Sequence, residues 1–295
     1  MPVFAYYPGC SLKQTSAFYD KQVKYVCHTL DMQLEEIEDW NCCGATSAGK
    51  IDNYMSLLMP ARNIAIAESK GYGEIAVPCS ACYSRTITTL TYLRQDKNLL
   101  EQISSDLNYQ IQGNITISNL LELLWKPACN GKLKSKLQAS FNGLTVVCYY
   151  GCMLNRFPAD VDIFDDPENP QTMEKILNIL GCHTPDWNSK TACCGASAAV
   201  NDQAVAYKLM SAIFKEAFMR GAECIVTTCP MCQMNLDLYQ KNMQEHSSSE
   251  RSLPIFYLTE LIGWALDFPE KDLQLEKHFV QGTETLKESL EYVRQ

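Results

Sequence analysis

The chain has 295 residues, of which 46% are hydrophobic, and this length is enough for two domains of ordinary size. Its formal net charge of −9, without any block of Lys and Arg, argues against a nucleic-acid partner, because phosphate backbones would be repelled. No apolar run approaches the ~18 residues of a membrane span, and the amino terminus lacks the pattern of a signal peptide, so we expect a cytoplasmic protein.

Short β-rich runs alternate with longer helical patterns along the chain. We expect strands at 4–7, 34–37, 74–77 and 115–117, and again at 144–147, 183–185, 224–227 and 254–257. The clearest helix spans 203–220, where apolar side chains recur at helical spacing and Gly221 ends the pattern. Its counterpart over 54–70 contains Pro60, which should kink that helix or mark its start.

This alternation predicts an α/β fold made of two similar, tandem-duplicated domains, each a small, mostly parallel sheet flanked by helices. We place the first domain at 1–125 and the second at 144–267. A linker at 126–143, rich in lysines and carrying Pro127, joins them. The charged tail at 268–295 is expected to be helical.

One cysteine pattern occurs twice, at very similar spacings. The first copy reads C-x31-CCG-x34-C-x2-C and the second C-x40-CCG-x33-C-x2-C. We call their cysteines the first set and the second set: Cys10, Cys42, Cys43, Cys79 and Cys82; Cys152, Cys193, Cys194, Cys229 and Cys232. Chance does not repeat such a pattern, and a duplicated metal-binding or redox unit is its simplest cause.

The cysteines of each set follow predicted strands and precede predicted helices. The carboxyl ends of parallel strands share one edge of a sheet, where ligands bind. We therefore expect segments that are distant in the sequence to bring the five cysteines of each set together. The segments before Cys10 and Cys152 resemble each other, and so do those around the two CCG triplets, which extends the repeat beyond the cysteines.

Three kinds of chemistry use cysteines in such patterns. Disulfides are rare in the cytoplasm, so metal binding or redox chemistry is favoured. A zinc ion takes four ligands and leaves one cysteine of each set unexplained. Dithiol chemistry at the C-x-x-C pair leaves three unexplained. Iron–sulfur clusters have all-thiolate ligation and several irons, so all five have a use, although the usual ferredoxin run is absent. Iron–sulfur chemistry fits best, and zinc and dithiol chemistry remain alternatives.

Residues outside the two sets give weaker signals. The other five cysteines are expected to be buried or incidental thiols, with Cys148 and Cys182 the nearest exceptions. His28 and His183 could donate a proton to a departing thiolate, but ordinary structural roles are favoured. Four cations flank the motifs and could hold an anionic group, although solvated charge is the favoured interpretation of each: Lys13, Lys50, Arg85 and Arg156. The paired tyrosines at 6–7 and 149–150 are expected in the strand cores beside the sets.

The duplicated pattern resembles the CCG domain, which occurs twice in the B subunit of CoB–CoM heterodisulfide reductase and its bacterial relatives. Nearly the whole chain takes part, including the segments 6–10, 39–44, 78–83 and 164–170 and the second CCG set. The gap of 40 residues after Cys152 slightly exceeds the usual range, which suggests a surface insertion. CCG units also occur in lactate-utilisation and glycolate oxidase subunits, in thiol:fumarate reductase and in an atypical succinate dehydrogenase subunit.

The resemblance implies that each set holds one noncubane [4Fe-4S] cluster, and that the two clusters face each other across the domain interface. All ten cysteines of the two sets would then be cluster ligands. It further implies an oxidoreductase subunit that reduces or reversibly forms a disulfide, such as that of coenzyme M and coenzyme B, or another small-molecule or protein disulfide. Expected partners are a ferredoxin-like C subunit and a flavoprotein A subunit. The alternatives are an electron-transfer subunit of a quinone, flavin or acyl-CoA redox complex and a zinc-stabilised scaffold protein.

Overall fold

The first half of the chain forms a parallel four-stranded sheet. The computed structural model describes residues 1–45, 47–157, 161–246 and 252–292. The sheet has the order β2-β1-β3-β4 and consists of β1 (Val3–Tyr6), β2 (Gln33–Glu36), β3 (Glu74–Val77) and β4 (Thr116–Asn119). Every neighbouring pair is parallel, so the connections must be crossovers that pass over a face of the sheet.

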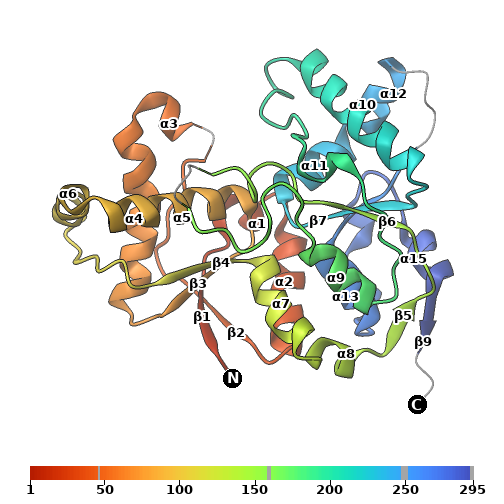
Figure 1. The fold of residues 1–295 in the computed structure, drawn as a ribbon, viewed down its shortest axis with the longest axis horizontal. Coiled ribbons are helices and arrows are strands. Elements are labelled where there is room, and N and C mark those ends of the chain that lie inside the picture. Colours follow the sequence, from red (N-terminus) through yellow and green to blue (C-terminus); the bar gives the residue numbers. More distant parts are fainter. Residues whose placement is uncertain (46, 158–160, 247–251, 293–295) are drawn as a thin grey trace.

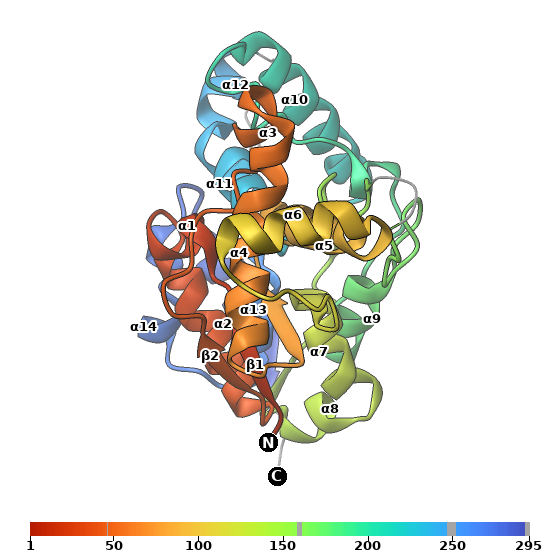
Figure 2. The ribbon, with the colours of Figure 1, turned by 90° about the vertical axis from the view of Figure 1, so that its left-hand side faces the viewer.

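Helices cover both faces of this sheet. They are α1 (Gly9–Lys13), α2 (Ala17–Thr29), α3 (Ala48–Ile51), α4 (Asn53–Ser69), α5 (Ser80–Gln95), α6 (Lys97–Leu107) and α7 (Leu120–Cys129). In Figure 1, α4, α5 and α6 lie on the outer side, and α2 and α7 lie between the first sheet and the second half. Figure 2 views the molecule from that outer side, with α5 and α6 toward the viewer. The helices toward the second half are therefore the ones that can join the halves.

The second half repeats this arrangement around a three-stranded parallel sheet with the order β6-β7-β8. Its strands are β6 (Val146–Tyr149), β7 (Cys224–Thr227) and β8 (Ile255–Tyr257). Its helices are α9 (Thr172–Ile179), the 3-10 helix η1 (Asn188–Thr191), α10 (Gln203–Met219), α11 (Pro230–Leu238), α12 (Gln240–His246) and α13 (Leu258–Ala265). In the view of Figure 1, α10 and α12 lie above this sheet and α9 and α13 below it.

The predicted fold class is thus confirmed, but one predicted strand, at 183–185, is much shorter than expected. The run 183–185 makes a single parallel bridge, between His183 and Thr145, beside β6. Pro185 has no N–H to donate, so a longer ladder cannot form there. This bridge occupies the place that β2 has in the first sheet, and both halves follow the same topology.

The helices after the CCG triplets also match between the halves. Asp52 accepts a hydrogen bond from the backbone N–H of Met55 at the start of α4, and Asp202 accepts one from Val205 at the start of α10. Of the two expectations for Pro60, a kink or a helix start, the structure excludes the helix start. Pro60 lies buried inside α4, and the aspartate cap upstream of it places the start at Asn53.

The segments predicted as linker and tail contain regular structure and contact each other. The linker region holds the end of α7, α8 (Lys132–Lys136) and β5 (Ala139–Phe141). The tail holds α14 (Glu270–Leu273), η2 (Leu275–Lys277), α15 (Thr283–Ser289) and β9 (Leu290–Tyr292). Strands β5 and β9 pair antiparallel, so these two segments close on each other. The proposed domain boundaries remain a prediction.

Buried contacts join the two halves. Helix α2 contacts α13, and α7 contacts α9. The rings of Tyr19 and Tyr257 stack with centroids 3.8 Å apart, and the Tyr19 hydroxyl donates to the carbonyl of Thr228 at 2.8 Å. Gln22 donates to Glu260 at 3.1 Å. One continuous apolar core contains residues of both halves, so the halves pack as one body.

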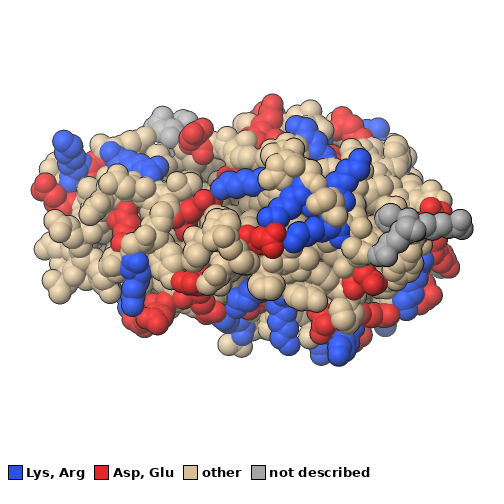
Figure 3. Space-filling view, turned by 90° about the horizontal axis from the view of Figure 1, so that it is seen from below, with Lys and Arg blue, Asp and Glu red and all other residues tan. Residues whose placement is uncertain are grey.

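Charge on the surface is mixed in spite of the net negative balance. Figure 3 shows a face on which Lys and Arg side chains gather among scattered acidic ones. Helix α8, at the bottom of Figure 1, contributes Lys132, Lys134 and Lys136, of which two pair with Asp31. Among the described residues, no helix is both long and apolar enough to span a membrane.

Candidate functional site

Both cysteine sets lie just beyond the carboxyl ends of parallel strands, as predicted. In the first half, Cys10 lies in α1 after β1, Cys42 and Cys43 follow β2, and Cys79 and Cys82 lie at the start of α5 after β3. In the second half, Cys152 follows β6, Cys193 and Cys194 follow η1, and Cys229 and Cys232 lie at the start of α11 after β7. The parallel topology therefore places each set at one edge of its sheet.

The same close pair of thiols occurs in both sets. The Sγ atoms of Cys43 and Cys82 are 3.3 Å apart, and those of Cys194 and Cys232 are 3.6 Å apart. In each set the C-x-x-C pair and the second cysteine of the CCG triplet are buried. The other two are more accessible: Cys10 and Cys42 are exposed, and Cys152 and Cys193 are intermediate. Each set thus offers three buried thiols and two accessible ones.

A glycine before the first cysteine of each set brings the backbone against the last cysteine. Gly9 and Gly151 both have φ near +70°, a conformation that favours glycine. A Cβ atom would lie 2.6 Å from the Cys82 sulfur at Gly9 and 3.0 Å from the Cys232 sulfur at Gly151. Any side chain would therefore push the sulfur away, so the glycine is required for this close approach.

The buried tyrosines behind the sets also match. The Tyr7 hydroxyl donates to the carbonyl of Asn41 at 2.8 Å, and the Tyr149 hydroxyl donates to the carbonyl of Ala192 at 2.6 Å. Asn41 and Ala192 each immediately precede a CCG triplet. The tyrosines predicted in the strand cores at 6–7 and 149–150 are all buried, and this pair holds the backbone of the two triplets in place.

Thiols within each set shift one another's pKa. Hydrogen bonds from Cys42 and then from Cys82 lower the pKa of Cys43 to about 3, against the opposing effect of burial. In the second set, a hydrogen bond from Cys152 lowers the pKa of Cys193 to about 6. The donating thiols have raised pKa values in return. Each set therefore supplies thiolate at neutral pH, which is the form that binds metals.

The two sets lie close to the junction of the halves. Helix α1, which carries Cys10, contacts α11 of the second half. Burial is the largest cause of the raised pKa of Tyr19 and Tyr257, and Cys79 and Cys229 both add to it. A cysteine from each set thus lies near the same stacked tyrosine pair.

A cavity of about 830 Å³ opens between the halves beside the second set. The second half lines it with all five cysteines of the second set, together with small and polar residues around its CCG triplet. The first half lines it with residues of α3, α4 and α5, including Lys50 and Arg85. We call this space the interhalf cavity. It gives a small molecule access to the second set.

Of the six weaker site predictions, the structure brings two into the interhalf cavity. Lys50 and Arg85 line it, whereas Lys13 pairs with Glu36 at 2.6 Å. Arg156 is exposed on the segment after Cys152. His28 lies exposed near the end of α2, and His183 is exposed beside the start of β6, both away from the carboxyl edges that carry the cysteines.

The remaining cysteines behave as core or surface thiols. Cys27, Cys148, Cys182 and Cys224 are buried and Cys129 is exposed. Burial raises the pKa of all four buried thiols, so they stay protonated. Among the described residues, no group of three or more His, Cys, Asp or Glu side chains is arranged around one point as the ligands of a single metal ion.

Sequence reasoning missed a buried charged network that joins both halves and the tail. His278 contacts Glu260 at 2.8 Å through Nε2 and Gln233 at 3.2 Å through Nδ1. Asp237 lies 3.8 Å from the same ring. Burial opposes the charge of His278, but Glu260 and Asp237 raise its pKa above the ordinary value. Glu260 has the same place in the segment 258–261 as Glu122 has in 120–123, but no sequence pattern indicates His278.

A second buried cation supports the second set. Lys190 is 3% exposed and pairs with Glu174 at 3.1 Å and with Asp186 at 2.9 Å. Its carbonyl accepts hydrogen bonds from the backbone N–H groups of Tyr150 and Gly151, just before Cys152. Lys190 therefore joins the segment before Cys193 to the segment before Cys152.

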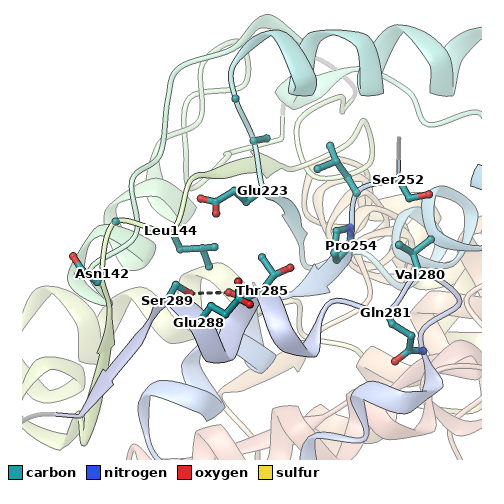
Figure 4. Close-up of a pocket in the computed structure, with 14 residues that line it drawn as sticks. Asn142, Leu144, Glu223, Ser252, Pro254, Val280, Gln281, Thr285, Glu288 and Ser289 are labelled. Carbon is teal, nitrogen blue, oxygen red and sulfur yellow. Dashed lines mark hydrogen bonds between the residues drawn. The ribbon is translucent and has the colours of Figure 1, made fainter. Parts of the chain in front are cut away.

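Another cavity, of about 610 Å³, lies at the opposite edge of the second sheet. Figure 4 shows Leu144, Glu223 and Pro254, which precede β6, β7 and β8, facing Thr285 and other residues of the tail. None of the described residues that line it is a cysteine. This cavity is therefore separate from the two sets.

Comparison with protein families gives two matching stretches, and each contains one complete cysteine set. A model of the cysteine-rich domain CCG matches residues 4–85 and 146–237. This chain belongs to the family of proteins with the cysteine-rich CCG domain. We refer to the two matched stretches as the CCG units.

Two relatives match nearly the full chain. The 8-methylmenaquinol:fumarate reductase membrane anchor subunit of Wolinella succinogenes is 34% identical over 95% of this chain and 98% of its own length. The B subunit of the ferredoxin/F(420)H(2)-dependent CoB-CoM heterodisulfide reductase of Methanosarcina acetivorans is 26% identical over 97% of this chain and 96% of its own. Both are subunits of redox enzymes.

Among solved structures, a hypothetical protein from Helicobacter pylori has a TM-score of 0.73 at 12% sequence identity. The match covers 94% of this chain, and the chain spans about half of that protein's length. At this identity the likeness concerns the fold alone.

Proposed function

We propose that this chain is the two-cluster iron–sulfur subunit of a larger redox complex. Each CCG unit would hold one noncubane [4Fe-4S] cluster, with Cys10, Cys42, Cys43, Cys79 and Cys82 as ligands in the first and Cys152, Cys193, Cys194, Cys229 and Cys232 in the second. The observation that carries this proposal is the repeated geometry of the two five-cysteine sets, from the close pairs of thiols to the glycine against the last sulfur.

The residues present fit such a group. Each set supplies thiol ligands alone, and neighbouring thiols already favour thiolate in each. Gly9 and Gly151 keep the space beside the buried sulfurs free of side chains. The second set also borders the interhalf cavity, which leaves room beside its sulfurs.

The reaction that we favour is the reduction or formation of a disulfide in the interhalf cavity. Iron–sulfur clusters pass electrons one at a time, and two of them supply the pair of electrons that splitting a disulfide requires. The chain's own contribution is to enclose the reacting sulfur between the halves.

A specific likeness favours a second candidate, an electron relay in a quinol-linked complex. The relative with 34% identity is named as a subunit of an 8-methylmenaquinol:fumarate reductase. In that role the clusters would pass electrons onward to another centre, and no disulfide would react here. Both candidates require partner proteins, and under the first we propose a ferredoxin-like C subunit and a flavoprotein A subunit.

Reoxidation of the reduced protein separates the two candidates. Anaerobically purified protein should contain about eight irons and little zinc, from two clusters of four. The protein is reduced with reduced viologen, and the excess viologen is removed. Addition of a disulfide should then return the cluster spectrum to that of the oxidised protein and release thiol. A menaquinone analogue is the matched trial oxidant. Rapid oxidation by the quinone alone would support the relay, and about one zinc per set without iron would reject both.

A further inference from the structure

Two cations line the interhalf cavity. Lys50 from α3 and Arg85 from α5 face it, and no Asp or Glu is present among its described lining residues. Its other polar groups are serines and asparagines, which are neutral, and the second cysteine set, which contains the lowered-pKa thiol of Cys193. Lys50 and Arg85 are the charged residues described in the wall that the first half contributes, so this wall favours the anionic group of a ligand over a neutral or cationic one.

Arg85 is held in place but incompletely satisfied. Its Nη2 donates to the carbonyl of Ala45 at 3.1 Å. Its Nε is buried and has no hydrogen-bond partner in the part of the chain that the structure describes. A buried donor without a partner is unfavourable, and more so in a charged group, so the guanidinium of Arg85 has donor capacity that the described residues do not use. A carboxylate can accept from two guanidinium nitrogens at once.

The duplication indicates that bracing the CCG triplet does not require an arginine. Arg85 lies three residues after Cys82, and Asn235 lies three residues after Cys232. The Asn235 side chain donates to the carbonyl of Cys194 at 2.8 Å and is buried. A neutral amide therefore occupies the equivalent position in the second half, whereas Arg85 donates to Ala45, just after the first triplet, and adds a charge that the second half lacks there.

We propose that Arg85, assisted by Lys50, binds the carboxylate-type group of a small anionic thiol or disulfide in the interhalf cavity. The sulfur end of this ligand faces the second cysteine set. This inference rests on the proposed function to the extent that the ligand contains sulfur. The anion-binding role rests on the cavity itself.

Binding of three small disulfides with the same S–CH2CH2 arms and end groups of different charge tests this site. The probes are 3,3′-dithiodipropionate, bis(2-hydroxyethyl) disulfide and cystamine, which are anionic, neutral and cationic. Calorimetric titration uses the anaerobically purified, cluster-containing protein without a reductant, so no turnover occurs. The anionic probe should bind at least tenfold more tightly than the neutral one, and cystamine more weakly still.

Substitutions then identify the residues that cause the preference for the anionic probe. Arg85→Asn introduces the residue that the second half already uses, and it should abolish the preference. Arg85→Lys should retain part of it, and Lys50→Gln should weaken it while leaving the buried contacts intact. Arg220→Gln removes an exposed cation at the end of α10, outside the cavity, and should change nothing.

Three outcomes would overturn the proposal. They are equal affinity for all three probes, an unchanged preference in Arg85→Asn, and no binding of any probe. An Arg85→Asn variant that alters the cluster spectrum but keeps the preference would show that this cation serves the second cluster instead. Reoxidation of reduced protein by a neutral disulfide would still support the proposed function in each case, so the two failures are distinguishable.

Discussion

The two CCG units hold their cysteines alike but differ in what surrounds them. The glycine before the first cysteine, the tyrosine behind the triplet and the close thiol pair recur in both. Around them, Arg85 in the first unit corresponds to Asn235 in the second, and the cavity borders only the second set. Duplication has kept the parts that hold the sulfurs and changed the parts that a ligand or partner would meet.

A pair of equivalent glutamates shows the same divergence. Glu122 accepts from the backbone N–H of Asn119 at the start of α7, and Glu260 accepts from that of Tyr257 at the start of α13. Glu122 is partly buried, and Tyr83 donates to it at 3.1 Å. Glu260 is completely buried with His278 beside it. One capping position has thus become part of a charged network in the second half only.

The largest expected effect comes from removing a ligand from either set. Cys43→Ala and Cys194→Ala should each lower the iron content from about eight to about four, because each cluster lies within its own unit. If the clusters act as a pair, both variants should lose disulfide turnover by several orders of magnitude. Iron analysis and turnover with reduced viologen check this.

The comparison between the two variants decides how the clusters work. A spectrum of each variant must first show that the cluster of the unsubstituted unit is still present. A single-cluster variant that turns over near the parent rate would exclude paired cleavage and favour the relay. Loss of all iron from both variants would show that ligation crosses between the units.

The next largest effect concerns the charged network. His278→Ala should destabilise the protein by about 3–5 kcal/mol, because it leaves the Glu260 carboxylate buried without its partner. Anaerobic urea unfolding measures this. The double variant Glu260→Gln/His278→Ala should recover part of the loss, and an equal loss in both variants would contradict the pairing.

A smaller effect, and one that depends on pH, is expected at Glu122. Burial, the largest cause, raises its pKa from 4.5 to about 7, against hydrogen bonds from Ser118 and Tyr83. The folded state therefore binds the proton more tightly than the unfolded state, and this stabilisation is present below pH 4.5 and lost as the pH rises to about 7. Glu122→Gln stays neutral and avoids that loss.

The stability difference between Glu122→Gln and the parent should shift by about 2 kcal/mol in favour of the variant between about pH 5 and pH 8. Urea unfolding at several pH values in that interval gives the curve. Glu288→Gln, an exposed tail residue, serves as the control. Parallel pH curves for Glu122→Gln and the parent would contradict the raised pKa.

The smallest effect is expected at a cysteine outside the sets. Cys224 is buried in β7, and replacing its thiol by a hydroxyl in Cys224→Ser should cost about 1–2 kcal/mol of stability. Both clusters should remain, because this residue lies outside the duplicated pattern. Disappearance of the second cluster's spectrum from folded Cys224→Ser protein would show that the ligands are assigned wrongly.

Local patterns in the sequence were sufficient for the α/β class and for the position of both cysteine sets. Alternating strands and helices dictate a parallel sheet, and a parallel sheet places the residues after its strands at one edge. The helix expected at 203–220 agrees with α10 to within one residue, because its apolar spacing and Asp202 cap are local signals. The run at 183–185 failed as a strand because Pro185 limits pairing to one bridge.

Contacts between distant segments were decided only by the tertiary structure. Gln22 and Glu260 lie 238 residues apart in the sequence, and no periodicity links them. The burial of His278 and the position of Arg85 in the interhalf cavity depend in the same way on how the second half packs against the first. The sequence by itself determined which cysteines form the two sets, because those signals are local. The cavity and its charge arise where two folded units meet, so only the packed structure determines them.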